Sequence, residues 1–179
     1  PPADPRDPDV AFRMLRGGIL GLAIHDLPLV RSLCPDFDRV EVLSATALDP
    51  SGYLVNLRVG SIAVELLAIF SQSWVPEWYV EAIGDDRSVR IDFTPSYVHA
   101  GSAVATLREA TESRVLGPFP MNGYEGEWRF VADVAHGTVE PLDVQSLIDD
   151  LTFALTVSDL ASAAARDEAL RTQVTRAAS

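Results

Sequence analysis

At the centre of the sequence stands Ala63-Val64-Glu65-Leu66-Leu67-Ala68-Ile69-Phe70-Ser71, the stretch that decides the fold. Apolar side chains occupy both alternations of this segment, so neither of its faces suits water. A short apolar run that is rich in Val, Leu and Ile and ends near turn residues predicts a β-strand. Because both faces are apolar, we expect this strand to be covered on both sides.

Similar short segments lie on both sides of this one, and each is rich in Val, Ile, Leu or aromatic residues. The expected strands are Arg39 to Leu48, Gly52 to Val59, Ala63 to Ser71, Trp78 to Ile83, Val89 to Phe93, Ala103 to Arg108 and Ser113 to Leu116. The clearest turns are Asp49-Pro50-Ser51-Gly52 and Gly84-Asp85-Asp86-Arg87. Connections this short favour antiparallel neighbours, because a parallel pair needs a long crossover.

Helical spacing appears at both ends of the chain. Apolar residues three and four apart predict a kinked helix from about Gly18 to Cys34. Pro28 also allows a new helix that begins with Asp26 as its N-cap. Near the other end, residues 122–136 predict a helix that stops at Gly137, and Val144 to Ala165 predicts another. In that last helix the expected buried stripe is Leu147, Leu151, Ala154, Leu155, Ser158 and Ala161.

This order of elements predicts an α+β fold with one open, predominantly antiparallel or mixed β-sheet of six or more strands and helices mainly on one face. Residues 1–11 are expected to be a Pro/Asp-rich linker, and residues 12–179 a single domain. The uncovered face of the sheet then needs a second subunit or another domain. We therefore expect a homo-oligomer that forms through the sheet face.

The charge of the chain limits its partners. It carries 26 acidic residues and 14 basic ones, all of them arginine, for a net charge of −12. This charge repels phosphate backbones and anionic membranes, so we expect neither nucleic acid nor a membrane as a partner. No apolar run approaches the roughly 20 residues that span a bilayer. Cys34 is the only cysteine, which excludes an internal disulfide and fits the cytoplasm.

Common catalytic and nucleotide motifs are absent from the sequence. A dinucleotide site needs a strand, a Gly-x-Gly-x-x-Gly turn and a helix, and the glycines at 17, 18 and 21 have the wrong spacing. No metal-ligand motif is present, so we expect no cofactor or metal to bind to this chain alone. On a continuous helix Gly18, Gly21 and His25 would share one face. Either this face leaves room for a substrate beside the imidazole, or His25 is a core residue and the glycines allow close packing.

Several segments carry a resemblance to a known family. The first reads Gly17-Gly18-Ile19-Leu20-Gly21-Leu22-Ala23-Ile24-His25-Asp26-Leu27-Pro28-Leu29-Val30-Arg31, the second Trp78-Tyr79-Val80-Glu81-Ala82-Ile83-Gly84, and the third Tyr124-x-x-Glu127-x-x-Phe130. In order and spacing they resemble the C-terminal domain of the Gfo/Idh/MocA oxidoreductases (glucose–fructose oxidoreductase, inositol dehydrogenase and relatives). The resemblance implies NAD or NADP, held by a Rossmann domain that is not in this chain, and a sugar, polyol or related hydroxy compound as substrate.

The resemblance also implies roles for individual residues. His25 would be the catalytic residue that assists proton transfer, and Gly21, Trp74 and Trp78 would lie at the substrate. Gly21 stands where the family has an aspartate, and the family lysine has no counterpart here. For Trp74 and Trp78, core packing at the end of a strand remains the alternative.

These observations predict the substrate-binding and oligomerisation half of an NAD(P)-dependent dehydrogenase, inactive alone. Two alternatives remain open. One is a stand-alone, non-catalytic binding or scaffold domain derived from the same fold. The other is half of a lyase or epimerase that uses His25 as a base.

Overall fold

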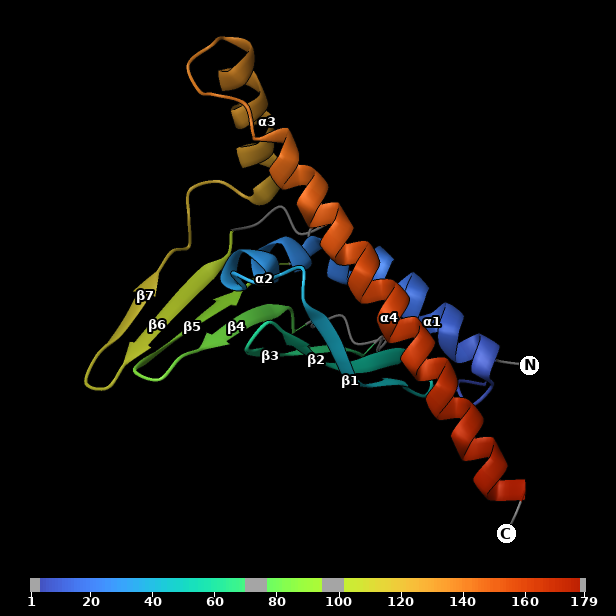
Figure 1. Cartoon of the computed structure of the whole chain (residues 1–179). Helices are drawn as coiled ribbons and strands as arrows, with labels where there is room; N and C mark the ends of the chain where they lie inside the picture. The colour runs from blue at the N-terminus through green and yellow to red at the C-terminus, as the bar shows by residue number, and fades with distance from the viewer. Residues whose placement is uncertain (1–3, 70–76, 95–101, 178–179) are drawn as a thin grey trace. The chain divides into compact units, whose positions relative to one another are not determined.

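The computed structural model describes residues 4–69, 77–94 and 102–177 (Figure 1). The chain forms two compact units. Unit 1 comprises Pro1–Gln72 and Asp143–Ser179, and unit 2 comprises Ser73–Leu142. Residues 12–179 thus contribute to both units, and unit 2 is inserted within the sequence of unit 1.

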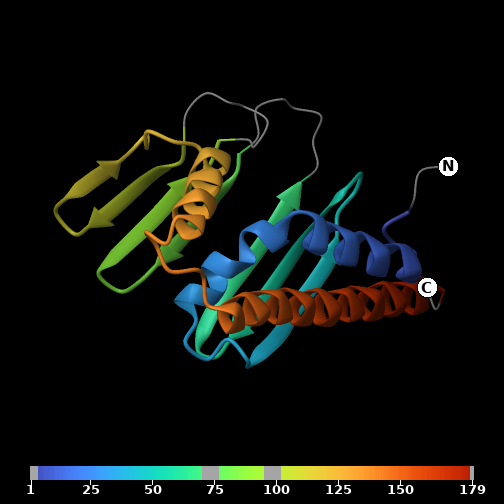
Figure 2. The same cartoon turned by 90° about the horizontal axis from the view of Figure 1, so that it is seen from above.

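Unit 1 contains a three-stranded antiparallel sheet in the order β1 (Val40–Ala47), β2 (Gly52–Val59), β3 (Ile62–Ile69). In this register Val55 lies opposite Ala45 and Leu66, so the three side chains share a face. This face is covered by α1 (Pro8–Gly21) and α4 (Val144–Ala177), as Figure 2 shows. The other face of the sheet is open, because no described helix of unit 1 lies against it.

The core of unit 1 lies between these helices and the sheet. Apolar side chains alternate along β2, so every second residue points towards the helices. The core side chains that are at most 2% exposed include Leu15, Ile19, Leu27, Val55, Leu57, Phe153 and Val157. By the same periodicity, α1 buries Ala11, Leu15 and Ile19.

Small residues bring α4 close to α1. Ala154, Ser158, Ala161, Ser162 and Ala165 are all buried on one side of α4. Such side chains allow two helices to approach closely. The Ser158 hydroxyl lies in this interface, where it finds no hydrogen-bond partner among the described residues.

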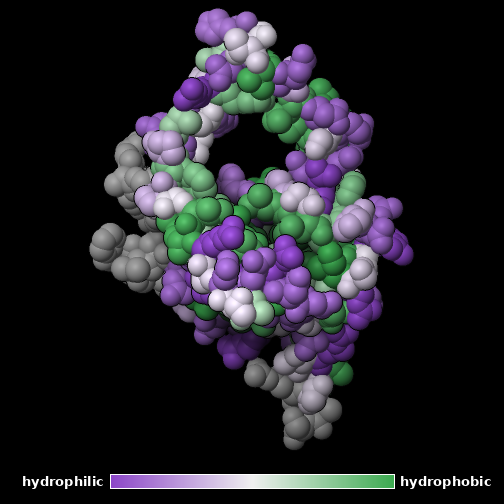
Figure 3. Space-filling view, turned by 90° about the vertical axis from the view of Figure 1, so that its left-hand side faces the viewer, coloured by the Kyte–Doolittle hydropathy of each residue, from purple (hydrophilic) through white to green (hydrophobic). Residues whose placement is uncertain are grey.

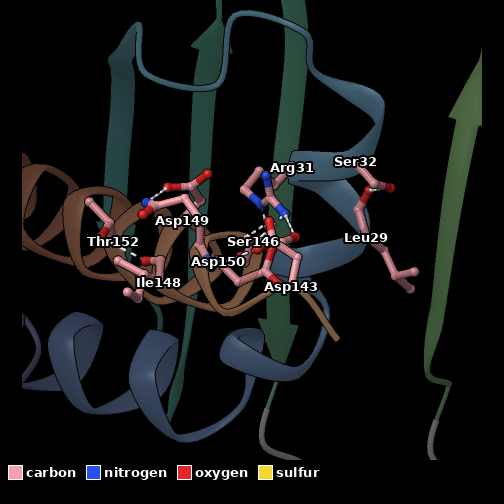
Figure 4. A network of polar contacts seen from close by, with 10 residues as sticks. Leu29, Arg31, Ser32, Asp143, Ser146, Ile148, Asp149, Asp150 and Thr152 are labelled. Carbon is pink, nitrogen blue, oxygen red and sulfur yellow. Dashed lines mark hydrogen bonds and ion pairs between the residues drawn. The ribbon is translucent and has the colours of Figure 1, made fainter. Parts of the chain in front are cut away.

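A network of polar contacts fixes the short helix α2 (Leu27–Leu33) against α4 (Figure 4). The Arg31 guanidinium forms an ion pair with Asp150 and donates a 2.8 Å hydrogen bond to the Ser146 hydroxyl. It also lies 5.0 Å from the centre of the Phe37 ring. Both charged side chains are largely buried, with 15% and 22% of their surface exposed. Arg31 is thus a structural residue that joins two helices.

Unit 2 contains the antiparallel sheet β4 (Tyr79–Ile83), β5 (Arg87–Asp92), β6 (Val104–Glu109), β7 (Ser113–Leu116), followed by α3 (Gly123–Ala135). The Asn122 side chain accepts from the Glu125 N–H, and Glu125 accepts from the Asn122 N–H, which is a capping box. Figure 3 shows apolar side chains among polar ones around α3, at the top of the view. Tyr124, Trp128 and Val131 on this helix are 55%, 73% and 49% exposed.

The α+β class predicted from the sequence is confirmed, but the single sheet of six or more strands is not observed. The structure contains two antiparallel sheets, with three and four strands. Alternating side chains identify a strand, whereas membership of a sheet depends on which strand edges exchange hydrogen bonds. Among the described residues, β3 and β4 are not paired.

The helices also differ from the sequence-based expectation at their ends. α1 begins at Pro8, inside the expected linker, because Asp7 caps it by accepting from the N–H groups of Asp9 and Val10. α4 extends to Ala177, beyond the predicted end at Ala165. Within the described residues, none of the helices combines the length and the apolar character needed to cross a membrane.

Candidate functional site

A groove of about 400 Å³ runs along one side of α1. It is lined by residues between Arg13 and Gly21 of α1, by Leu22 just after the helix, and by the end of the turn between β1 and β2. The lining residues are Arg13, Met14, Gly17, Gly18, Gly21, Leu22, Ser51 and Gly52. Two of the glycines singled out in the sequence, Gly18 and Gly21, therefore share one open surface.

Gly17 and Gly21 of α1 are not required by the packing of the fold. A Cβ atom added at Gly17 or Gly21 would have no neighbouring atom within 4 Å, so packing does not demand glycine there. Neither residue is among the described glycines with positive φ. Glycine inside a helix costs about 1 kcal/mol relative to alanine. Gly17 and Gly21 thus destabilise α1, and the packing of unit 1 does not explain why glycine occupies these positions.

Gly17→Ala is expected to raise the free energy of unfolding by about 0.5 to 1 kcal/mol, since the methyl group meets open space and restricts the unfolded chain. Urea denaturation of the two proteins measures this difference. A destabilised variant would show instead that the space beside Gly17 is needed by the folded protein.

The glycine-rich end of α1 does not fit a dinucleotide. Pyrophosphate binds at helix N-termini, where N–H groups point outward and the dipole is positive. Gly17, Gly18 and Gly21 lie in the last turns of α1, where carbonyl groups point outward instead. The glycines of α1 therefore do not form a pyrophosphate cradle.

His25 lies in a short 3₁₀ turn, η1 (Ala23–His25), between α1 and α2, and its side chain is exposed. The His25 N–H donates to the Leu22 carbonyl and the Asp26 N–H to the Ala23 carbonyl. Because α1 ends at Gly21, His25 does not continue the helical face of Gly18 and Gly21. The expected kinked helix is interrupted here, and a second helix begins after Asp26, which is the other arrangement that Pro28 allows. His25 is four residues from Gly21 but does not line the groove.

Tyr53 lies beneath this helix junction, on the core side of β2. It is only 2% exposed, and burial raises its pKa to about 12, with a further contribution from the negative charge of Asp26. The neutral phenol is therefore the form that the folded protein favours. Asp26, next to His25, is electrostatically coupled to this buried ring.

The folded-state pKa of Tyr53 predicts a loss of stability in alkali. Because the Tyr53 phenol has a higher pKa in the folded protein than in the unfolded chain, its neutral form adds to the free energy of unfolding. This addition is complete below the unfolded pKa of about 10 and is lost as the pH rises towards 12. We expect about 1.4 kcal/mol of this contribution to be lost by about pH 11. The chain has no lysine to titrate in this range.

Urea unfolding at a series of alkaline pH values measures the effect, with Tyr53→Phe as the comparison. The free energy of unfolding of the native protein should fall more steeply than that of the variant. Cys34 is buried as well, with a raised pKa, but its contribution is common to both proteins. Parallel pH profiles would contradict the burial of the Tyr53 hydroxyl.

Of the two tryptophans expected near the substrate, Trp78 belongs to the described residues, and it does not line the groove. Trp78 precedes β4 in unit 2, where its ring packs on Phe93 at 4.8 Å with a 34° tilt. It is half-buried, and its carbonyl accepts from the Phe93 N–H. These contacts favour packing at the end of a strand. Trp74 lies outside the described residues.

Several residues that line the groove do not stand out in the sequence as functional, among them Arg13, Met14, Ser51 and Gly52. Arg13 precedes Gly17 by four residues, so helical spacing alone could have placed both on one face. Ser51 and Gly52 were recognised only as a turn. Their position beside α1 depends on tertiary packing, which the local sequence does not reveal.

Comparisons with known proteins add no relative. The sequence matches no protein-family model and none of the curated proteins. Within the described residues, no group of three or more His, Cys, Asp or Glu side chains is arranged to hold a metal ion. The chemistry of the site must therefore be argued from the groove and its surroundings.

Proposed function

We propose that this chain is the substrate-side half of a two-domain NAD(P)-dependent oxidoreductase that acts on a sugar, polyol or related hydroxy compound. The observation that carries the proposal is the open groove over Gly17, Gly18 and Gly21, followed within four residues by the exposed imidazole of His25. The resemblance of residues 17–31 to the signature helix of the Gfo/Idh/MocA oxidoreductases supports the same assignment.

In this proposal His25 acts on the reacting hydroxyl or carbonyl group. An exposed imidazole can hydrogen-bond a substrate oxygen and act as a general acid or base on it. The family has an aspartate four residues before this histidine, and Gly21 stands at that position here. Asp26 is the adjacent carboxylate in the sequence, and its charge acts on Tyr53. The imidazole is thus left without the carboxylate that the family provides at position 21.

The nucleotide would be bound by a separate domain, because the glycines of α1 do not fit its pyrophosphate. NAD(P) supplies or accepts the hydride when it is bound there. The residues of this chain would hold the hydroxy compound in the groove and move a proton at His25. The family lysine would also come from the nucleotide domain, since this chain contains none.

The reading frame that encodes this chain tests the proposal. We expect the parent polypeptide to encode a strand, a Gly-x-Gly-x-x-Gly turn and a helix outside these residues. In that parent, His25→Ala should lower kcat by at least about 100-fold, as expected when a general acid–base group is lost. His136→Ala is the matched control, because His136 is exposed at the end of α3. A parent with no nucleotide-binding domain would exclude the proposal.

One observation favours a second candidate, a non-catalytic binding or scaffold domain. With Gly21 in place of the family aspartate and carbonyl groups at the end of α1, the site lacks two features of redox catalysis. Such a domain would still bind a polyol in the groove. Tight NAD(P)H binding by this chain alone, measured by fluorescence titration, would exclude it.

We also propose that unit 1 self-associates through the open face of its sheet. Leu67 and Ile69 on this face are 55% and 65% exposed, and Leu54 pairs with Leu67. Elsewhere on the face Arg58 and Glu41 form a 3.1 Å ion pair. A second copy would cover the apolar end of the sheet. We expect the native chain to sediment as a dimer and the Leu67→Glu variant to sediment as a monomer. A native monomer of 19.4 kDa would contradict the proposal.

A further inference from the structure

Arg13 differs from the other arginines of the chain. Twelve of the fourteen arginines form ion pairs with carboxylates. The side chain of Arg176 lies outside the described residues. Arg13 is exposed and forms neither an ion pair nor a hydrogen bond with any described residue. In a chain with 26 acidic residues, an arginine without a carboxylate partner is unexpected.

The position of Arg13 makes the two ends of the groove chemically different. Arg13 lines it one turn before Gly17 and two turns before Gly21. At 1.5 Å per residue, eight residues of α-helix separate Arg13 from Gly21 by about 12 Å. The cation thus lies at one end of the groove, and the outward carbonyls of the last turn of α1 lie at the other.

The two ends of the groove suit different chemical groups. A guanidinium binds carboxylate and phosphate oxygens through charge-assisted hydrogen bonds. Helix C-terminal carbonyls carry partial negative charge, so they accept hydrogen bonds from hydroxyl groups and repel anions. The Ser51 hydroxyl, which also lines the groove, can both donate and accept. Between the two ends, the bare helix at Gly17 leaves room for a ligand to approach the backbone closely.

We infer that the groove binds a polyhydroxy compound with an anionic group at one end, a sugar acid or a sugar phosphate. The anionic group pairs with Arg13, and the hydroxyl groups lie over Gly17 and Gly21 towards the His25 end of α1. This inference rests on the proposed function. It narrows the proposed substrates from polyols in general, neutral or charged, to polyols that carry an anionic group. Arg13 is then the residue that determines specificity.

Titration of the isotope-labelled chain with three probes tests this inference by NMR. The probes are gluconate, glucose 6-phosphate and the neutral polyol glucitol, at matched ionic strength. The amide signals of Gly17, Gly18, Gly21 and Gly52 report on the groove. We expect both anionic probes to shift these signals with a Kd at least about tenfold lower than that of glucitol. One charge-assisted hydrogen bond contributes enough binding free energy to account for about this ratio. The tighter anionic probe identifies the anionic group.

Two variants assign the effect to one side chain. Arg13→Gln should weaken gluconate binding to the level of glucitol, about tenfold. Arg16→Gln is the matched control, because Arg16 is on the same helix but pairs with Asp159 and does not line the groove. This control should bind gluconate within about twofold of the native protein. Far-ultraviolet circular dichroism of both variants establishes that they are folded.

Three results would overturn the inference. The first is equal affinity for gluconate and glucitol in the native protein. The second is unchanged gluconate binding by Arg13→Gln. The third is a loss of self-association in Arg13→Gln, measured by sedimentation, without a change in gluconate binding, which would assign Arg13 to an acidic side chain of a second copy. The proposed function fails separately, through a parent polypeptide that has no nucleotide-binding domain.

Discussion

Phe153→Ala is expected to lower the free energy of unfolding by about 3 to 5 kcal/mol, the usual cost of truncating a buried aromatic residue. Phe153 is the largest of the fully buried side chains and is 2% exposed. It projects from α4 into the core of unit 1, where its ring meets Phe37 edge-to-face at 6.5 Å. Phe37 in turn lies under the Arg31 guanidinium. The substitution therefore leaves a cavity beside the network that joins α2 to α4.

Leu155→Ala provides the comparison for Phe153→Ala. Leu155 lies two residues further along α4, and it is 39% exposed. Because its side chain buries less apolar surface, we expect a loss of about 1 kcal/mol or less. Urea denaturation monitored by circular dichroism measures both variants. Similar losses at the two positions would contradict the assignment of Phe153 to the core.

Gly52→Ala is expected to have the second largest effect, a loss of about 2 to 4 kcal/mol. Gly52 begins β2 with a φ of +155°, a region that residues with a Cβ atom rarely adopt. An added Cβ would also collide with the backbone carbonyl oxygen of Ala68 on β3. This oxygen belongs to the paired strand, so relief of the clash requires the sheet to shift.

Gly17→Ala is the natural comparison for Gly52→Ala, because both glycines line the groove. The same chemical change should stabilise the protein at position 17 and destabilise it at position 52. The sign depends on whether the new methyl group meets open space or backbone. A Gly52→Ala variant as stable as the native protein would show that the turn between β1 and β2 is free to adjust.

Much of the local structure follows from the sequence. The predicted strands at residues 52–59 and 113–116 agree with β2 and β7 at both ends, because turn residues and alternating side chains bound them. The predicted helix after Asn122 agrees with α3 for a similar reason, since the capping box fixes its start. The arrangement of strands into two sheets could not be predicted. It depends on hydrogen bonds between segments whose local patterns are alike.

The buried face of α4 was predicted only in part. Ala154, Ser158 and Ala161 are buried as expected, whereas Leu147 and Leu151 are 49% and 52% exposed. Periodicity identifies which residues share a face, but it does not reveal where along the helix a neighbour lies. Here the part of α4 from Phe153 to Ala169 packs on α1 and the sheet, so the small residues there are covered and the leucines before it are not.

The candidate site, too, depends partly on the local sequence and partly on tertiary packing. The cost of glycine in a helix is a local property, so the sequence alone indicates Gly18 and Gly21. Arg13 stands out because it forms no ion pair with a described carboxylate, and that depends on the packing of the whole unit. The break after Gly21 could not be located either, because Pro28 allowed both a kink and a new helix.

The insertion of unit 2 between β3 and α4 has a consequence for biosynthesis. The ribosome releases α1 and the first sheet early, then all of unit 2, and only afterwards α4. Phe153 and Val157, which complete the first core, therefore emerge roughly 100 residues after β1, against which α4 packs, a delay of several seconds or more at ordinary elongation rates. During this interval the apolar side of β2 is exposed in the nascent chain. Unit 2 has all of its residues outside the ribosome before unit 1 can close.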